Sequence, residues 1–235
     1  GGRGPLLTRA IVPARSGVPP RRLPRPFDAA CRELLALALG LGVRDVVPRL
    51  ERTAQGEERA LARGAWTNAP FVLVGSGGRP NSAKAPPLEV FEAWLAALEG
   101  ALPAEVVLAF ACGPGEEERA RRLAVGSRRI ALVDPIAELP ELVSLAARAV
   151  SYFGPDGGPR HVAAAAGASC VVVFGPTDPR HTASGLAARA RLLEAVDCGP
   201  CHRERCPFDG EADRRCFRRI DAARVVRAVA LDARS

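Results

Sequence analysis

The sequence predicts an α/β fold, a Rossmann-like parallel sheet with helices on both faces, and three observations support this class. From Phe71 onward, short apolar runs alternate with longer segments in which apolar residues recur at helical spacing. Each run is apolar on both faces, as in strands of a sheet that is covered on two sides. Glycine or proline follows each run closely, which is typical of the end of a strand.

The elements are expected in the following order. A leucine-rich helix is predicted at 27–41 and a polar helix at 56–63. Strands are predicted at 71–75, 105–111, 129–133, 149–153 and 170–174. Further helices are predicted at 87–98, 116–124, 138–149, 160–166 and 222–231. Ligands of open parallel sheets bind at the carboxyl ends of the strands, so a site is sought in the loops 75–86, 112–115, 134–137, 154–159 and 175–182.

Composition restricts the class of protein. Of the 235 residues, 48% are hydrophobic and 25% are charged, as in ordinary globular proteins. No apolar run approaches the ~20 residues of a membrane-spanning helix. Residues 1–26 are rich in Arg and Pro but lack the apolar centre of a secretory signal, so we expect a cytoplasmic protein. Because methionine is absent, we expect a fragment whose front is missing.

The net charge of +7 favours anionic partners, although a solvated arginine-rich surface explains the charge alone. Lys84 is the single lysine among 33 basic residues. An ammonium group and a guanidinium group are not equivalent, so this lysine is a candidate functional residue.

Lys84 lies in a glycine-rich loop, 75–87, which also carries Ser76 and Ser82. Glycines after a strand let backbone N–H groups approach an anion, and the following helix presents its positive end. The loop lacks the spacing of a P-loop or of a Gly-x-Gly-x-x-Gly motif. A binding loop for a diphosphate therefore stands beside the plainer alternative, a turn with a solvated lysine.

A second loop carries Asp156, Gly157, Gly158 and His161. A carboxylate there can accept hydrogen bonds from sugar hydroxyls, while the glycine N–H groups face phosphate. Two alternatives remain open: Asp156 could cap the helix that follows, and His161 could be a packed or capping histidine.

A third loop, 174–182, contains Thr177 and Asp178 and by itself is typical of a turn. Together with the second loop it becomes more specific. The order Asp156-Gly-Gly-Pro-Arg-His161, then alanines, then Val171-Val-Val-Phe-Gly-Pro-Thr-Asp-Pro-Arg180, resembles the signature of glycosyltransferase family 9, the lipopolysaccharide heptosyltransferases. The resemblance covers about 71–231, and it departs from the family where Ala85-Pro86 stands in place of the Trp-Pro or similar pair after the lysine.

The resemblance implies a two-domain GT-B architecture with the active site in the cleft. Residues 67–235 would form the C-terminal nucleotide-sugar-binding domain, and residues 1–66 the tail of an acceptor domain that is largely missing. No residue in 1–70 matches the family's Gly-Asp motif, so the catalytic base is unknown. The implied reaction is an inverting, metal-independent transfer from an ADP-activated heptose to a lipopolysaccharide core or related glycan.

The resemblance also implies residue roles. Lys84 and the backbone at Gly157 and Gly158 would stabilise the diphosphate, helped by Ser76 or Ser82. Asp156 would hold sugar or ribose hydroxyls, with His161, Thr177 and Asp178 as further donor-binding residues. The transfer would need no cofactor. The expected partners are an ADP-sugar donor and an anionic glycolipid acceptor, with peripheral contact at the inner membrane and no nucleic acid.

Four cysteines cluster near the end of the sequence: Cys198, Cys201, Cys206 and Cys216. Cys-x-x-Cys followed by two further thiols is compatible with a structural zinc site, and reduced or redox-active thiols are the alternative.

Two rival functions remain. The chain could be a basic zinc-clip module that binds nucleic acid, although few aromatic residues accompany its arginines. It could also be another GT-B sugar-nucleotide enzyme, such as an epimerase, because fold alone does not decide chemistry.

Overall fold

The computed structural model describes residues 40, 49–79, 81–125, 127, 129–133, 138–179, 190–193 and 196–230. Apart from Gly40, the helix predicted at 27–41 lies outside these residues. The described strands form one six-stranded sheet of order β3-β2-β1-β4-β5-β6, in which every neighbouring pair is parallel. The strands are β1 (Phe71–Gly75), β2 (Val107–Ala111), β3 (Ile130–Val133), β4 (Ser151–Pro155), β5 (Cys170–Phe174) and β6 (Ala190–Leu193).

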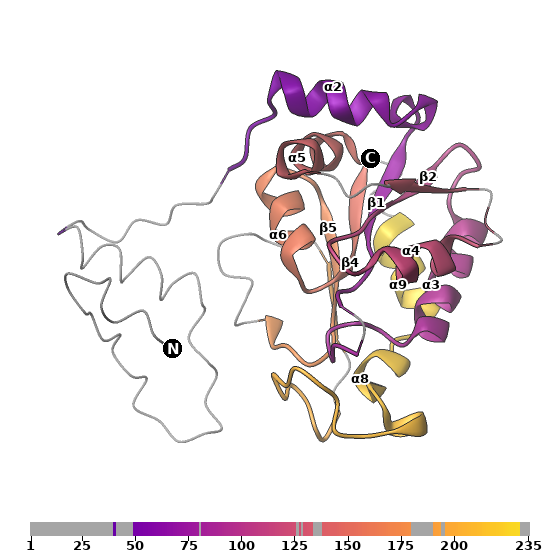
Figure 1. The fold of residues 1–235 in the computed structure, drawn as a ribbon. Coiled ribbons are helices and arrows are strands. Elements are labelled where there is room, and N and C mark those ends of the chain that lie inside the picture. The colour runs from indigo at the N-terminus through magenta and orange to yellow at the C-terminus, as the bar shows by residue number, and fades with distance from the viewer. Residues whose placement is uncertain are drawn as a thin grey trace. The chain divides into compact units, whose positions relative to one another are not determined.

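Helices cover both faces of this sheet, as predicted (Figure 1). They are α2 (Ala54–Ala62), α3 (Leu88–Ala101), α4 (Glu117–Ala124), α5 (Leu139–Arg148), α6 (Gly158–Ala165), α8 (Arg215–Arg218) and α9 (Ala222–Ala230). Short 3₁₀ turns occupy Ala65–Asn68 and Gly210–Ala212.

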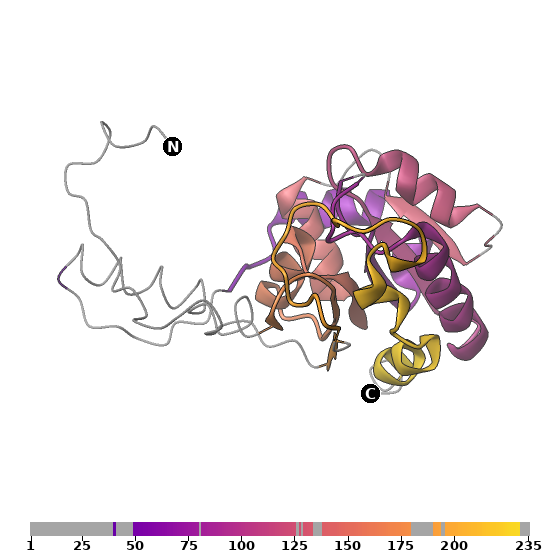
Figure 2. The same ribbon diagram turned by 90° about the horizontal axis from the view of Figure 1, so that it is seen from below.

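The two faces of the strands build two separate cores, because successive side chains of a strand point to opposite sides. Val72, Val74 and Phe110 face one core, which α3, α4, α8 and α9 complete. Phe71 and Leu73 face the other, which α2, α5 and α6 complete. Helices α3 and α9 pack side by side on the first face (Figure 2).

The described part of the chain differs from the prediction mainly at element ends. Strand β4 runs to Pro155, two residues beyond the predicted end, because Gly154 and Pro155 still pair with Val172 and Val173 of β5. Helix α3 continues to Ala101 rather than ending at 98. Strand β6, helix α8 and the 3₁₀ turns were not predicted from the sequence, and each has four residues or fewer.

Helix α2 lies before residue 67, the predicted start of the C-terminal domain. It nevertheless packs on α5 within the compact unit Arg49–Asp178 and Ala188–Ser235. An ion pair between a half-buried arginine and a buried glutamate joins the two, in which Arg63 Nη2 lies 3.0 Å from Glu141 Oε2. No helix in the described ranges is both long and apolar enough to span a membrane.

Candidate functional site

The strand order changes direction between β1 and β4, which lie side by side at the centre of the sheet. From β1 the chain continues outward to β2 and β3, whereas β4 continues to β5 and β6 on the other side. The loops after β1 and β4 therefore separate and leave a crevice at their carboxyl ends, the place where doubly wound sheets bind ligands. A pocket of about 100 Å³ lies there.

Both loops named by the sequence analysis line this pocket. Its walls consist of Gly75, Gly77, Gly78, Ser82, Lys84, Glu116, Tyr152, Pro155, Asp156, Gly157, Gly158 and Pro159. A volume near 100 Å³ accommodates part of a nucleotide sugar, since whole-ligand pockets usually measure ~300 Å³ or more.

The first wall is the loop after β1. Gly77 and Gly78 have φ angles of 105° and 100°, a region in which side chains are strained, so glycine is required for this turn. A Cβ at Gly77 would also lie 2.9 Å from Pro86 Cδ. Lys84 is exposed beyond the turn, while its neighbours Ala83 and Ala85 are buried. The backbone on both sides of Lys84 is thus anchored, and its exposed side chain lines the pocket.

The second wall is the turn from β4 into α6. Asp156 is 5% exposed and lies 3.6 Å from the guanidinium of Arg160, which is fully buried. The N-cap position of α6 is occupied by Gly157, so Asp156 lies one residue before the N-cap position that the sequence left open for it. The first N–H groups of a helix lack intrahelical acceptors and carry partial positive charge.

Glu116 completes the pocket, and the sequence analysis missed it. It precedes α4 directly and accepts hydrogen bonds from the Ser76 hydroxyl and from the N–H of Gly113, the latter at 3.1 Å. The sequence could have indicated Glu116, because this residue follows the loop 112–115 at the carboxyl end of β2, where a ligand site was expected.

The structure therefore gathers five of the nine predicted donor-binding residues around the pocket: Ser82, Lys84, Asp156, Gly157 and Gly158. Ser76 is buried behind the wall, with its hydroxyl turned toward Glu116. Thr177 and Asp178 are buried after β5, and His161 lies one helical turn into α6 beside Arg160. These four do not line the pocket, and their roles stay predictions.

Tyr152 forms the floor. It is 1% exposed, and burial raises the pKa of its hydroxyl far above the ordinary value, so the phenol stays neutral. A Cβ placed on Gly75 would lie only 2.2 Å from Tyr152 Oη. Tyr152 therefore packs directly against the backbone of Gly75 and leaves no room for a side chain there.

A larger pocket, of about 340 Å³, lies at the cysteine segment, 198–219. Its wall contains Cys198, Cys201, Cys206 and Cys216 together with apolar residues such as Phe208. Burial raises the pKa of the Cys216 thiol to about 11. Among the described residues no three His, Cys, Asp or Glu side chains form a set that could hold a metal ion, so the zinc site stays a prediction. Glycine turns and a helix N-terminus favour the smaller pocket as the anion site.

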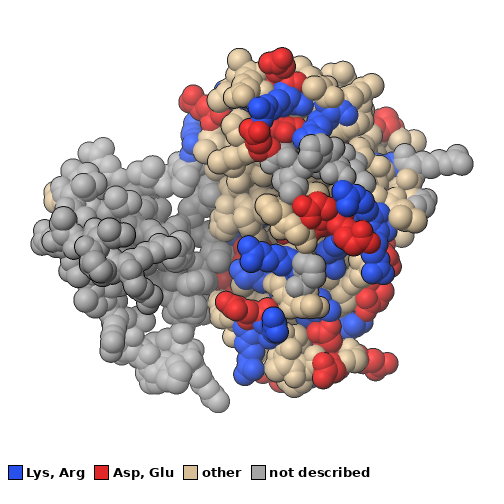
Figure 3. Space-filling view, viewed as in Figure 1, with Lys and Arg blue, Asp and Glu red and all other residues tan. Residues whose placement is uncertain are grey.

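Basic and acidic side chains alternate on the face seen in Figure 3, and no continuous basic stripe crosses its described part. A nucleic-acid groove normally presents such a stripe.

Comparison with known proteins agrees with this geometry. Residues 29–211 match glycosyltransferase family 9 (heptosyltransferase). Lipopolysaccharide heptosyltransferase 1 of Pseudomonas aeruginosa is 31% identical over 121 residues, which are 47% of this chain and 34% of that protein.

Among solved structures, a family 9 glycosyltransferase from Veillonella parvula has a TM-score of 0.67 at 19% identity and covers 90% of this chain and 62% of its own. An E. coli heptosyltransferase solved with ADP has a TM-score of 0.57 at 21% identity, covering 86% and 55%. These likenesses show the fold. The chain spans less than two thirds of the length of each of these relatives.

Proposed function

This chain belongs to glycosyltransferase family 9, and on that premise we propose that it forms the donor-binding half of a heptosyltransferase. The donor would be an ADP-activated heptose and the acceptor a lipopolysaccharide core or related anionic glycolipid. We also propose a cytoplasmic location with peripheral contact at the inner membrane. The acceptor site and the catalytic base are assigned to no residue of this chain.

The main support for this proposal is the pocket between β1 and β4, at the switch point where the strand order changes direction. It combines a cation, Lys84, with glycine N–H groups at the start of α6 and with two carboxylates, Asp156 and Glu116. Cation and N–H groups suit a diphosphate, and carboxylates suit ribose or sugar hydroxyls. Both requirements of a nucleotide sugar thus meet in one small space.

In such a transfer the bond between the sugar carbon and the diphosphate breaks as oxocarbenium charge develops on the sugar. Negative charge grows on the departing diphosphate, and preorganised positive groups lower the barrier by stabilising it. Lys84 and the N–H groups near Gly157 and Gly158 would supply that stabilisation without a metal ion. Asp156, itself oriented by Arg160, would hold hydroxyls of the donor.

The cysteine segment carries a separate proposal, a structural zinc site. Thiolate sulfur is a preferred zinc ligand, and the four thiols border one pocket. Their present arrangement does not bring three of them together as ligands, so zinc would have to draw them closer. Metal analysis of the chain purified without a His-tag tests this proposal, and the absence of stoichiometric zinc would remove it.

The rival functions gain no support. Family 9 membership accounts for the α/β core, which a nucleic-acid module would leave unused. The nucleobase of the ligand distinguishes a heptosyltransferase from another sugar-nucleotide enzyme: ADP and ADP-heptose should bind more tightly than UDP-sugars.

Isothermal titration calorimetry with these ligands is the test. Asp156→Ala is a poor probe, because it would leave the buried Arg160 charge without this carboxylate and destabilise the fold. Gly158→Ala is better, since its Cβ meets nothing within 4 Å yet adds bulk at the pocket wall.

We expect Gly158→Ala and Lys84→Ala each to weaken ADP binding about tenfold, or ~1.4 kcal/mol. Gly100→Ala is the matched control, because its Cβ also meets nothing within 4 Å and it lies in α3, outside the pocket. Unchanged affinity in both pocket variants would contradict the proposed site.

A further inference from the structure

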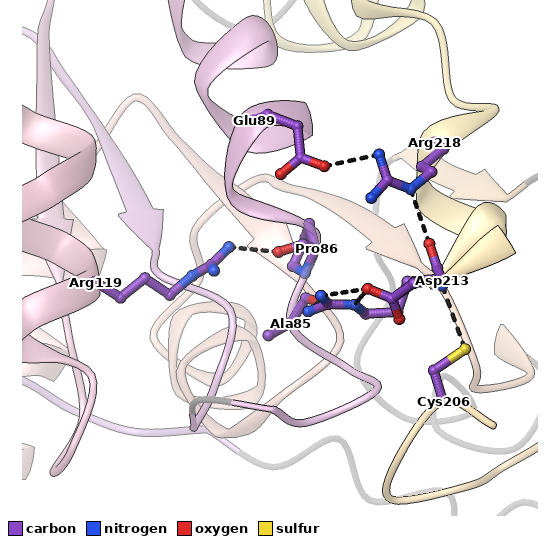
Figure 4. A network of polar contacts seen from close by, with 8 residues as sticks. Ala85, Pro86, Glu89, Arg119, Cys206, Asp213 and Arg218 are labelled. Carbon is purple, nitrogen blue, oxygen red and sulfur yellow. Dashed lines mark hydrogen bonds and ion pairs between the residues drawn. The ribbon is translucent and has the colours of Figure 1, made fainter. Parts of the chain in front are cut away.

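Two arginines from distant parts of the chain hold the backbone around Lys84. The first is Arg119 of α4, whose Nε donates to the carbonyl of Ser76 at 2.8 Å and whose Nη2 donates to that of Pro86 at 2.6 Å. Figure 4 shows the Arg119 side chain extended toward Pro86. This arginine therefore ties together the two ends of the loop 76–86.

The second is Arg214, from the cysteine segment. Its Nη1 donates to the carbonyl of Ala85, the residue after Lys84, at 3.0 Å. Asp213 orients the guanidinium through Nε and Nη2 at 2.8 and 2.5 Å. The backbone N–H of Arg214 in turn donates to Cys206 Sγ at 3.3 Å. One residue thus contacts both the lysine loop and a cysteine of the cluster.

Further contacts join the cysteine segment to the lysine loop and to the start of α3. The N–H of Ala83 donates to the carbonyl of Glu204 at 2.8 Å, and Arg218 pairs with Glu89 of α3 at 2.7 Å. Arg218 also donates to the carbonyl of Asp213 at 2.8 Å (Figure 4). The residues on both sides of Lys84 are therefore bonded to the cysteine segment, while the lysine side chain stays exposed.

We propose that Arg214 is a positioning residue that sets the place of Lys84, so that the cysteine segment supports the anion site of the donor pocket. The inference rests on the proposed function, because it gives Lys84 a diphosphate to bind. Arg214 does not line the donor pocket. Its influence on the donor must therefore pass through the carbonyl of Ala85 and the loop, rather than through contact with the ligand.

The first readout needs no ligand: hydrogen–deuterium exchange of the loop 76–86 in the 235-residue chain. We expect Arg214→Ala to raise amide exchange in this loop at least fivefold. Arg214→Lys, which keeps a donor and the charge, should restore part of the protection. Arg215→Ala is the matched control, since it removes an adjacent arginine that contacts Asp197 and the Phe208 ring rather than the loop.

The second readout is the affinity for ADP. Arg214→Ala should weaken binding three- to tenfold, and in the double variant with Lys84→Ala the two losses should not multiply, because both act through one ammonium group. Arg215→Ala should leave the affinity within twofold. If Arg214→Ala impairs folding, Asp213→Asn, which removes the negative charge that orients the guanidinium, should give smaller changes of the same sign.

The outcomes are distinguishable. If the wild-type chain binds no ADP, the proposed function fails, and with it the role of Arg214 in donor binding. This holds even if hydrogen exchange shows that Arg214 stabilises the loop 76–86. If ADP binds but Arg214→Ala alters neither loop exchange nor affinity, the positioning role is refuted. Multiplying losses in the double variant would also overturn it, because Arg214 would then act independently of Lys84.

Discussion

Replacing Gly75 by alanine tests how closely the pocket floor is packed. The new Cβ would lie 2.2 Å from Tyr152 Oη and 3.1 Å from Cζ, whereas ordinary contacts begin near 3.4 Å. Tyr152 is 1% exposed and its ring is rigid, so the ring or the strand must move by roughly 1 Å. Gly75 has no positive φ, so backbone strain adds nothing. We expect a loss of about 2–3 kcal/mol in unfolding free energy, within the usual range for overpacking.

Tyr152→Phe should relieve most of this steric clash, because removal of Oη leaves Cζ at 3.1 Å as the nearest atom to the new Cβ. In a double-mutant cycle measured by urea unfolding, we expect a coupling free energy of about 1–2 kcal/mol. Gly100→Ala, with open space around its Cβ, should be neutral or stabilising by up to ~1 kcal/mol. A cost below ~0.5 kcal/mol for Gly75→Ala, or additive single costs, would refute the steric argument.

Two further predictions concern charge. Burial raises the pKa of Cys170 to about 11, so the folded state retains this proton longer than the unfolded state: stability is complete below pH ~9 and falls between about 9 and 11, by about 1 kcal/mol per pH unit. Urea unfolding of Cys170→Ala between pH 8 and 10.5 should show a shallower decline, and an unchanged slope would contradict this. Arg63→Ala should cost about 3 kcal/mol in the same assay, because Glu141 is 3% exposed and would remain buried without its arginine. Arg52→Ala, which breaks an exposed ion pair, should cost under ~1 kcal/mol, and equal costs for the two would contradict the burial argument.

Strands were predictable from the sequence where local apolar patterning and burial agree. Strands β1 and β5 match their predicted bounds, because each is a run of apolar side chains that serves both cores. Strand β4 was misplaced by two residues, since Gly154 and Pro155 look like a turn and only pairing with β5 keeps them in the sheet. Strand β6 and helix α8 have four residues each, which are too few to establish a hydrophobic period.

The candidate site was partly predictable for a similar reason. Lys84 and Asp156 follow strands whose carboxyl ends meet at the switch point, so topology alone brings their loops together. The direction of single side chains was not predictable. Ser76 turns toward Glu116, and Arg214 reaches Ala85 across 129 residues of sequence, contacts that depend on tertiary packing.

In the proposed function, the pocket between β1 and β4 holds the diphosphate of the donor. A crystal structure of the chain with ADP tests it most directly. We expect the diphosphate to lie within hydrogen-bonding distance of the N–H groups at Gly157 or Gly158, with the Lys84 ammonium beside it. ADP bound instead in the larger pocket of the cysteine segment would contradict the proposed donor site.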